Sequence, residues 1–408
     1  MSVNDLFSGV AVIIDDEIED KTANINKLIS QIEKNKMPCL KYNRIPEDDV
    51  IKNWKGISFV LLDWNLNGSS DGNTTRGVKY PEGIKKENIE SNIKFLKNFK
   101  NICFAPVFIF TNEDIDVVIS TLKESKLYKD NKPNYIFIKE KYALTRKNSL
   151  FNAMQDWIKH TPPVYVLKVW ESEYEKAKTA LFHNFYEIDP NWPKIIWKSF
   201  SDDGTNVSSG LGEMIVRNLY TRMTPFEFDS NMIKRKNKKR KGNGNESSKK
   251  EIRGVFEGER FLRANRIHQD TIAAGDVFKI SGKIYLNVRP DCDCIPDRKD
   301  KSCNIDSVYL YLIEGTTISN IKEKEIFLKN YGHFKELESQ AIVFSMIDNH
   351  TYDFRFKKFI IINFAETKKN GNQKIGRLLP PYITRIQQKF SLYIQRQGMP
   401  RIPNIFKK

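Results

Sequence analysis

The sequence lacks the features of membrane-embedded and disulfide-rich proteins. It contains no apolar run that approaches the ~20 residues a helix needs to cross a bilayer. The N-terminal segment MSVNDLFSGVAVIIDDE has no basic residue before its short apolar run, so we do not expect a secretory signal. Among 408 residues there are five cysteines, an odd and low count that argues against a disulfide framework. These absences predict a cytoplasmic protein with no membrane partner.

Familiar catalytic and DNA-reading motifs are also missing from the second half of the chain. Residues 164–408 contain no P-loop, no HExxH, no GxSxG and no nuclease-like acidic pair. They contain no helix-turn-helix pattern with a clear recognition helix either. The sequence therefore gives no support to a turnover enzyme in this region, although it does not exclude one.

The composition is that of a globular chain with an excess of positive charge. Hydrophobic residues make up 40% and charged residues 29%, and 408 residues are enough for two or three domains. The formal net charge is +16, and much of the excess lies in one tract, Lys234–Lys241. Such a tract could bind nucleic acid through phosphates without reading its sequence, or it could be a solvated linker.

The first 160 residues alternate apolar strands with amphipathic helical patterns, which predicts βαβ units and a parallel sheet. The expected strands are Val10–Ile14, Cys39–Tyr42, Phe59–Leu62, Val107–Phe110 and Tyr135–Ile138. Helical patterns between them include Thr22–Asn35 and Asn88–Phe99. We therefore expect an α/β fold for residues 1–160.

The remaining residues divide into three predicted parts. The prolines of Thr161-Pro162-Pro163 end the preceding helix, and residues 161–231 form a helical connector. Residues 232–251 are a basic Lys/Asn/Gly/Ser linker, which we expect to be disordered. Residues 252–408 show strand periodicity and form a β-rich domain, closed by a helix that starts at Pro381 and stops before Gly398.

Carboxylates follow two of the predicted strands. Asp15 and Asp16 come directly after Val10–Ile14, and Asp63 comes directly after Phe59–Leu62. Open α/β sheets place ligand sites at the carboxyl edge of their strands, so we expect the three aspartates to converge there. Carboxylates packed together repel unless a cation lies among them, and Mg²⁺ is a hard cation that prefers oxygen ligands. The sequence therefore predicts a magnesium site.

Two further polar residues end neighbouring strands at the same edge. Thr111 follows the fourth predicted strand and Lys139 follows the fifth. A hydroxyl and an ammonium group can share the charge of phosphoryl oxygens, while Asp63 attacks the phosphorus atom. These parts suit phosphoryl transfer onto a carboxylate. The alternative is that Asp63 is a polar strand cap that is never phosphorylated.

Four segments in order resemble the receiver domain of two-component response regulators over residues ~8–159. They are "IIDDE", "LLDWNLNGSSDG", "APVFIFTNED" and "YIFIKE". The resemblance implies a flavodoxin-like five-stranded fold with Asp63 as the phospho-acceptor. It implies that Thr111 and Lys139 contact the phosphoryl group. It further implies that the Mg²⁺ ligands are Asp15, Asp16, Asp63 and the Asn65 carbonyl. One departure is Glu140, which follows Lys139 where the family usually has proline.

The resemblance also implies partners. A histidine kinase would phosphorylate Asp63, and the C-terminal domain or a downstream effector protein would carry the output. Receivers with unusual C-terminal domains resemble those of bacterial phage-defence systems, which suggests that role by analogy. Homodimerisation is a further expectation. Two other functions stay open: a DNA-binding transcription regulator that uses the basic linker and residues 252–408, and a phosphate sink or scaffold whose receiver only docks.

Three cysteines raise a weaker metal hypothesis. Cys292, Cys294 and Cys303 lie within twelve residues, "CDCIPDRKDKSC". Zinc sites usually have four ligands, and the fourth would have to come from His268, His333 or a nearby aspartate. Packing of these cysteines in strands and loops is the other reading.

Overall fold

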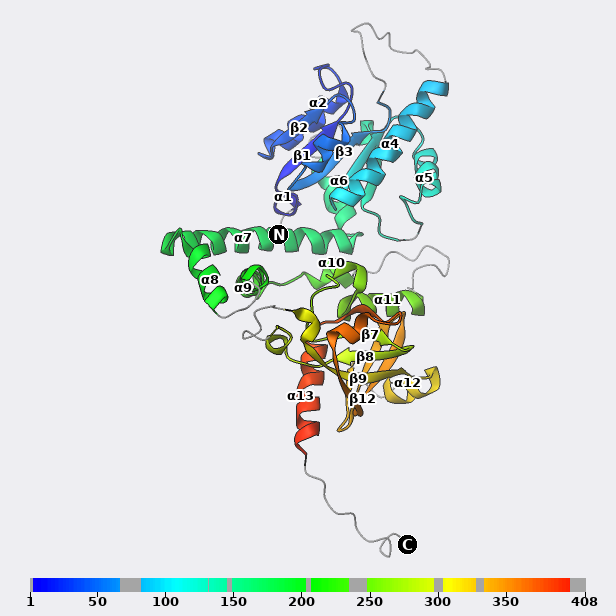
Figure 1. Ribbon diagram of the computed structural model, residues 1–408. Coiled ribbons are helices and arrows are strands. Elements are labelled where there is room, and N and C mark those ends of the chain that lie inside the picture. The colour runs from blue at the N-terminus through cyan, green and yellow to red at the C-terminus, as the bar shows by residue number, and fades with distance from the viewer. Residues whose placement is uncertain are drawn as a thin grey trace, which may run out of the picture. The chain divides into compact units, whose positions relative to one another are not determined.

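The computed structural model describes residues 3–66, 82–130, 132–144, 149–202, 207–234, 248–296, 304–327 and 334–396. The chain is mixed α/β and forms two compact units (Figure 1). The first comprises Met1–Ser201 with Asn206–Asn245, and the second comprises Asp202–Thr205 with Glu246–Lys408. Among the described residues, no helix is both long and apolar enough to cross a membrane.

The first unit is built on a five-stranded parallel sheet in the order β2-β1-β3-β4-β5. Its strands are β1 (Val10–Ile14), β2 (Cys39–Tyr42), β3 (Ile57–Asp63), β4 (Val107–Thr111) and β5 (Ile136–Glu140). This order is consistent with a flavodoxin-like fold, in which ligands bind beside the point where the strand order reverses, between β1 and β3. The parallel α/β sheet predicted for residues 1–160 is confirmed.

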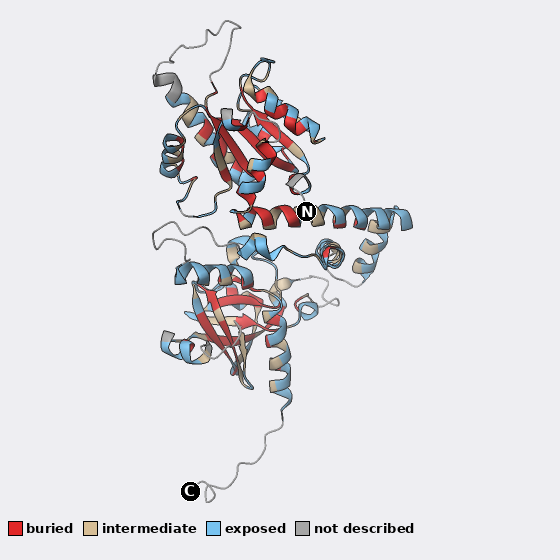
Figure 2. Cartoon of the chain, turned by 180° about the vertical axis from the view of Figure 1, so that it is seen from behind, coloured by how far each residue is buried: buried red, intermediate tan, exposed pale blue. Residues whose placement is uncertain are grey.

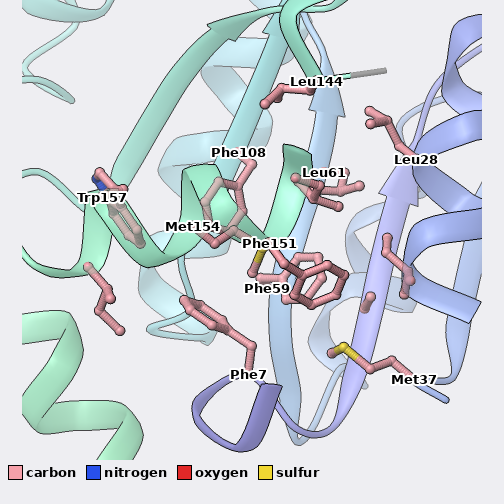
Figure 3. Close-up of a cluster of buried hydrophobic side chains, with 14 of the residues drawn as sticks. Phe7, Leu28, Met37, Phe59, Leu61, Phe108, Leu144, Phe151, Met154 and Trp157 are labelled. Carbon is pink, nitrogen blue, oxygen red and sulfur yellow. The ribbon is translucent and has the colours of Figure 1, made fainter. Parts of the chain in front are cut away.

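In the described part of the first unit, six helices precede α7 (Pro162–Ile188) and lie on the two faces of this sheet. They are α1 (Val3–Leu6), α2 (Asn24–Lys34), α3 (Asp48–Lys52), α4 (Glu82–Ile102), α5 (Ile115–Glu124) and α6 (Ser149–Ile158). Alternate strand residues face opposite sides, so each face has its own core. Figure 3 shows the core under α1, α2 and α6, where Phe7, Phe59 and Phe108 pack edge to face.

The residues predicted as a helical connector begin with a helix that joins the first unit. Helix α6 ends at Ile158 and α7 (Pro162–Ile188) begins at the first proline. Val164, Tyr165 and Val169 are buried in the same core as Phe7, so the first turns of α7 are part of that unit. The further helices are α8 (Trp192–Asp202), α9 (Val207–Met223) and α10 (Ser230–Lys234). The predicted disordered linker falls mostly on residues 235–247, which lie outside the described residues.

The second unit is built on an antiparallel eight-stranded sheet in the order β10-β11-β12-β9-β8-β7-β13-β6. Its strands are β6 (Phe261–Arg263), β7 (Asp276–Ile280), β8 (Lys283–Asn287), β9 (Tyr309–Thr317), β10 (Phe334–Glu336), β11 (Gln340–Ile347), β12 (His350–Asn363) and β13 (Gln373–Leu378). The predicted hairpin is β11–β12, whose turn residues Asp348 and Asn349 both have positive φ, at 50° and 62°. This pairing matches the β-rich prediction for residues 252–408.

Three helices accompany this sheet: α11 (Lys249–Arg260), α12 (Asn320–Phe327) and α13 (Tyr382–Gln395). The terminal helix α13 is the one predicted after Pro381, and it buries Ile383, Ile386 and Phe390 in the core of the unit. Helix α11 corrects the prediction, which placed a linker up to residue 251 and strand periodicity from residue 252. A capping box between Ser248 and Glu251 starts this helix, because each residue satisfies the other's free backbone N–H.

Candidate functional site

The three predicted aspartates converge at the carboxyl edge of the parallel sheet. Ile14 of β1 pairs with Leu62 of β3, so the residues that follow them lie side by side. One carboxylate oxygen from each of Asp15, Asp16 and Asp63 lies within 4.8 Å of the others. Asp15 and Asp63 are buried and Asp16 is half-buried. The sheet therefore gathers three oxygen donors at the place where flavodoxin-like folds bind ligands.

A buried lysine joins this cluster. Lys141, which directly follows β5, donates a hydrogen bond of 2.8 Å from Nζ to Asp63 Oδ2. The same Nζ lies 2.9 Å from Asp15 Oδ2 and 3.5 Å from Glu17 Oε2. The Lys141 backbone N–H donates to the carbonyl of Thr111, which fixes the lysine beside the end of β4. The sheet edge thus supplies an ammonium group between two carboxylates.

The sequence prediction placed this lysine two residues too early. Lys139 lies within β5, is exposed, and its Nζ is 6.0 Å from the ring centroid of Phe137. Strand β5 extends to Glu140, whereas the predicted strand ended at Ile138. Because the strand is longer, the residue that follows it is Lys141. The lysine that contacts the aspartates is therefore Lys141 and not Lys139.

Burial changes the proton affinity of the aspartates. Desolvation, and then the charge of Asp15, raise the pKa of Asp63 to about 7, although Lys141 opposes this rise. Desolvation also raises the pKa of Asp15 against the pull of Lys141. For Lys141, burial lowers the pKa, but the charges of Asp63 and Asp15 together outweigh it and keep the pKa above its ordinary value. The ammonium group is therefore charged at neutral pH, and the net effect of burial is to favour the protonated form of Asp15 and of Asp63.

Thr111 and Asn65 lie next to the cluster. Thr111 is fully buried at the end of β4, and its Oγ1 accepts a hydrogen bond of 2.8 Å from the Glu113 N–H. The Asn65 N–H donates 3.2 Å to Asp63 Oδ1, which turns the backbone back toward the carboxylate. Both residues occupy the edge where the sequence placed them. Their predicted roles, as a phosphoryl contact and a metal ligand, stay predictions.

The donor set suits a divalent cation. Three carboxylate oxygens that lie within 4.8 Å of one another are hard oxygen ligands of the kind that Mg²⁺ prefers. Among the residues that the structure describes, this is the one group of three or more acidic, histidine or cysteine side chains close enough to hold an ion. Asp15, Asp16 and Asp63 could therefore hold Mg²⁺.

Sequence reasoning missed a residue that holds the segment after Asp63. Asn92 of α4 is fully buried, and its Nδ2 donates 2.7 Å to the backbone carbonyl of Trp64. The Trp64 N–H donates 3.0 Å to the carbonyl of Phe110 in β4. The backbone next to Asp63 is thus held from both sides. A lone asparagine within a predicted helix gave no signal for this role.

The cysteine and basic-tract predictions lie partly outside the described residues. Cys292 is exposed, whereas Cys294 is buried and its Sγ lies 3.6 Å from Asn287 Nδ2. Desolvation raises the pKa of Cys294 to about 12. Cys303 and His333 lie outside the described residues, as does the tract from residue 235 to residue 241. The zinc and nucleic-acid hypotheses stay predictions.

Comparison with known proteins assigns no family. No protein-family model and no curated protein matches the chain. A solved structure of a fusion that contains a yeast Spc42 trimeric coiled coil is similar at 9% identity over 45% of this chain and 95% of that chain, with a TM-score of 0.25. A TM-score of this size does not indicate a shared fold. The chemistry of the site therefore rests on the geometry of its own residues.

Proposed function

We propose that this protein is a response-regulator-like signalling protein that accepts a phosphoryl group on Asp63. The observation that carries the proposal is the placement of Asp63 within 4.8 Å of Asp15 and Asp16 and 2.8 Å from Lys141 Nζ, at the carboxyl edge of a five-stranded parallel sheet. A strand cap would need no second and third carboxylate beside it. A phosphoryl acceptor needs a carboxylate nucleophile together with cationic groups that offset the charge of the incoming oxygens.

The chemistry is a displacement at phosphorus. A carboxylate oxygen of Asp63 forms the new P–O bond while the bond from phosphorus to the donor atom breaks, and the leaving group departs with the electron pair. Lys141 is placed to stabilise the negative charge on the phosphoryl oxygens. Thr111 lies at the end of β4, where a hydroxyl can contact one of those oxygens. Mg²⁺ bound at Asp15, Asp16 and Asp63 would supply further charge neutralisation.

The biological donor in this proposal is a histidine kinase, and the output is carried by the second unit or by an effector protein. Phosphorylation would change the charge of a buried site and so shift the equilibrium between two conformations of the first unit. A role in bacterial phage defence is part of the proposal by analogy with receivers that have unusual C-terminal domains. The described part of the chain supplies no specific support for sequence-reading of DNA.

Intact-mass spectrometry tests the proposal without a kinase. The full-length chain is incubated with acetyl phosphate and Mg²⁺, beside Asp63→Asn, which keeps the side-chain size and removes the nucleophile. We expect the wild type to gain one phosphoryl group, and no gain for Asp63→Asn or when EDTA replaces Mg²⁺. If the wild type gains nothing from acetyl phosphate or from a cognate kinase, the domain only docks, and the proposed acceptor function is wrong.

A further inference from the structure

The helices after the parallel sheet carry more exposed large apolar side chains for their length than the described residues before them. We define the helical arm as residues 177–202 and 207–223, which include the C-terminal part of α7 with α8 and α9. Helix α8 has no buried residue, and in α9 only Met223 is buried. Figure 2 shows α7 buried over its first turns and exposed toward its C-terminus, with α8 also largely exposed. Helices this short gain most of their stability from packing an apolar face, which these helices have not completed.

The helices of the arm contact one another through a small number of side chains. Ala177 and Leu181 of α7 are buried, and Arg222 of α9 reaches Asn184 Oδ1 at 3.5 Å. Trp192 at the start of α8 stacks on Phe185 with ring centroids 4.9 Å apart. A shallow groove between α7 and α8 is lined by Phe182, Tyr186 and Trp192, together with Lys178, Thr179 and His183. These contacts hold the arm together and leave several of its large apolar side chains exposed.

Seven large apolar side chains of the arm are exposed, each with 45–79% of its surface accessible. They are Phe182, Tyr186, Ile188, Ile195, Trp197, Val216 and Tyr220. An aromatic side chain has about 150–250 Å² to bury, so the exposed parts of Phe182, Tyr186, Trp197 and Tyr220 alone offer roughly 450 Å². This is more than half of the ~800 Å² that each partner contributes to a stable protein–protein interface. The exposed aliphatic side chains of the arm add to this area.

The charge of the arm indicates which kind of partner fits. Its described residues carry basic side chains at Lys178, Lys194, Lys198, Arg217 and Arg222, and acidic ones at Glu187, Asp189, Asp202 and Glu213. The arm is therefore nearly neutral in a chain of net charge +16. Nucleic acid and anionic lipid surfaces both need a basic patch, which the arm does not offer. Two copies of a +16 chain repel each other least when they approach through a region that is close to neutral.

We propose that the helical arm is a homodimer interface, in which the arms of two copies pack against each other about a two-fold axis. A two-fold contact brings the same surface of both copies together, so an apolar and nearly neutral patch is complementary to itself. The packed arms form an intermolecular helical bundle in which α8 and α9 obtain the core that each copy lacks. This dimer does not depend on phosphorylation of Asp63.

Sedimentation velocity of the full-length chain over a dilution series tests the proposal. We expect wild type to sediment with twice the 47.7 kDa mass of the chain. Val216→Glu and Tyr186→Glu should each raise the dimer Kd by about tenfold or more, because each buries an unpaired carboxylate at the interface. Val117→Glu is the matched control: Val117 lies on α5 with 55% of its surface exposed, against 64% for Val216, and the dimer should persist.

Salt and folding measurements complete the test. Circular dichroism and thermal melting establish that the three variants fold as wild type does, since the substituted residues are exposed. Dimerisation should strengthen with salt, because salt screens the repulsion between two positively charged copies. A wild-type chain that stays monomeric over the whole series would overturn the proposal. A dimer that persists in both Val216→Glu and Tyr186→Glu would also overturn it. So would a dimer that Val117→Glu disrupts while the two arm variants still dimerise.

Discussion

At the scale of single residues, Lys141 gives the site its balance of charge. Its ammonium group lies between the buried carboxylates of Asp15 and Asp63. Among the described residues, no second cationic side chain lies at ion-pair distance from these two carboxylates. Removing one partner of a buried ion pair costs about 3–5 kcal/mol, because the remaining charges have lost their compensation. Lys139, two residues earlier in the chain, is exposed and provides an internal comparison.

The first prediction compares these two lysines. In metal-free buffer at pH 8, Lys141→Ala should lower the unfolding free energy of the first unit by about 3 kcal/mol, whereas Lys139→Ala should change it by no more than about 0.5 kcal/mol. Lys141→Ala should also slow phosphorylation by acetyl phosphate, and Lys139→Ala should not. Urea denaturation and the mass-spectrometric assay measure the two effects. Equal effects of the two substitutions would contradict the assignment of Lys141 as the lysine that pairs with Asp15 and Asp63.

The raised pKa of Asp63 has a consequence for stability. The pKa is about 7 in the folded chain, above the ordinary value of 3.8. Between these two values the folded state keeps a proton that the unfolded state has released. Raising the pH through this window therefore favours the unfolded state, and the stability contributed at low pH is lost by about pH 7. The cause is the desolvation of a carboxylate, so removing its charge should remove the effect.

The second prediction concerns Asp63→Asn in EDTA. The melting temperature of the wild-type first unit should fall between pH 5 and pH 8. The melting temperature of Asp63→Asn should fall less over this range and should be the higher of the two at pH 8. At pH 8 the unfolding free energies of the two proteins should differ by on the order of a few kcal/mol. Mg²⁺ should raise the melting temperature of the wild type more than that of Asp63→Asn, since it binds the ionised carboxylates. Calorimetry over a pH series measures this, and a wild type that gains stability toward pH 8 in EDTA would contradict it.

At the scale of elements, helix α4 positions the backbone that follows β3. Asn92 reaches from α4 to the Trp64 carbonyl, directly after Asp63. The third prediction is that Asn92→Ala lowers stability by about 1–3 kcal/mol, because the buried carbonyl loses its donor. Asn98→Ala on the same helix removes a hydrogen bond to Asp48 on the surface and should cost less than about 1 kcal/mol. Urea denaturation distinguishes them, and a larger loss for Asn98→Ala would count against this role.

The sequence predicts a helix or a strand best where only one type of secondary structure fits the local pattern. Apolar runs such as Phe59–Leu62 lie in the predicted parallel sheet because they are buried on both faces. The end of β5 was not predictable, since Lys139 and Lys141 are two residues apart and a strand presents such residues on the same side. Which lysine follows the strand depends on where pairing with β4 stops, and that pairing continues to Glu140.

Helix α11 shows an error of a different kind. The Ser248-x-x-Glu251 capping box is visible in the sequence, but the polar composition around it favoured a linker. Tertiary contacts stabilise this helix: Arg260 is fully buried, and its Nη1 donates 2.7 Å to the Phe344 carbonyl. Its guanidinium also lies over the rings of Phe256 and Tyr382. Such contacts between distant segments leave no local pattern.

At the scale of the whole molecule, each unit has a core of its own. The two core clusters of the second unit consist of residues between Phe261 and Tyr393. The core of the first unit extends beyond the sheet, because Val164, Tyr165 and Val169 pack against Phe7 and its neighbours. Phe226 and Phe228 also pack against this core. The first unit therefore needs residues well beyond position 160.

The fourth prediction follows from these cores. A fragment of residues 246–408 should fold cooperatively alone, and so should residues 1–234. A fragment that stops at residue 160 should be less stable than residues 1–234 by at least about 3 kcal/mol, since it leaves several core side chains unpacked. Circular dichroism melts of the three fragments measure this. If residues 1–160 are as stable as 1–234, α7 is not part of the first unit's core.

The central claim, that Asp63 is the phosphoryl acceptor, is tested most directly by trapping the acyl phosphate. The full-length chain is phosphorylated with acetyl phosphate and Mg²⁺ and then reduced with borohydride, which converts an aspartyl phosphate to homoserine. Peptide mass spectrometry locates the converted residue. We predict homoserine at position 63 and at no other aspartate. Conversion at Asp15 or Asp16, or a phosphoryl group that stays on another residue type, would contradict the account.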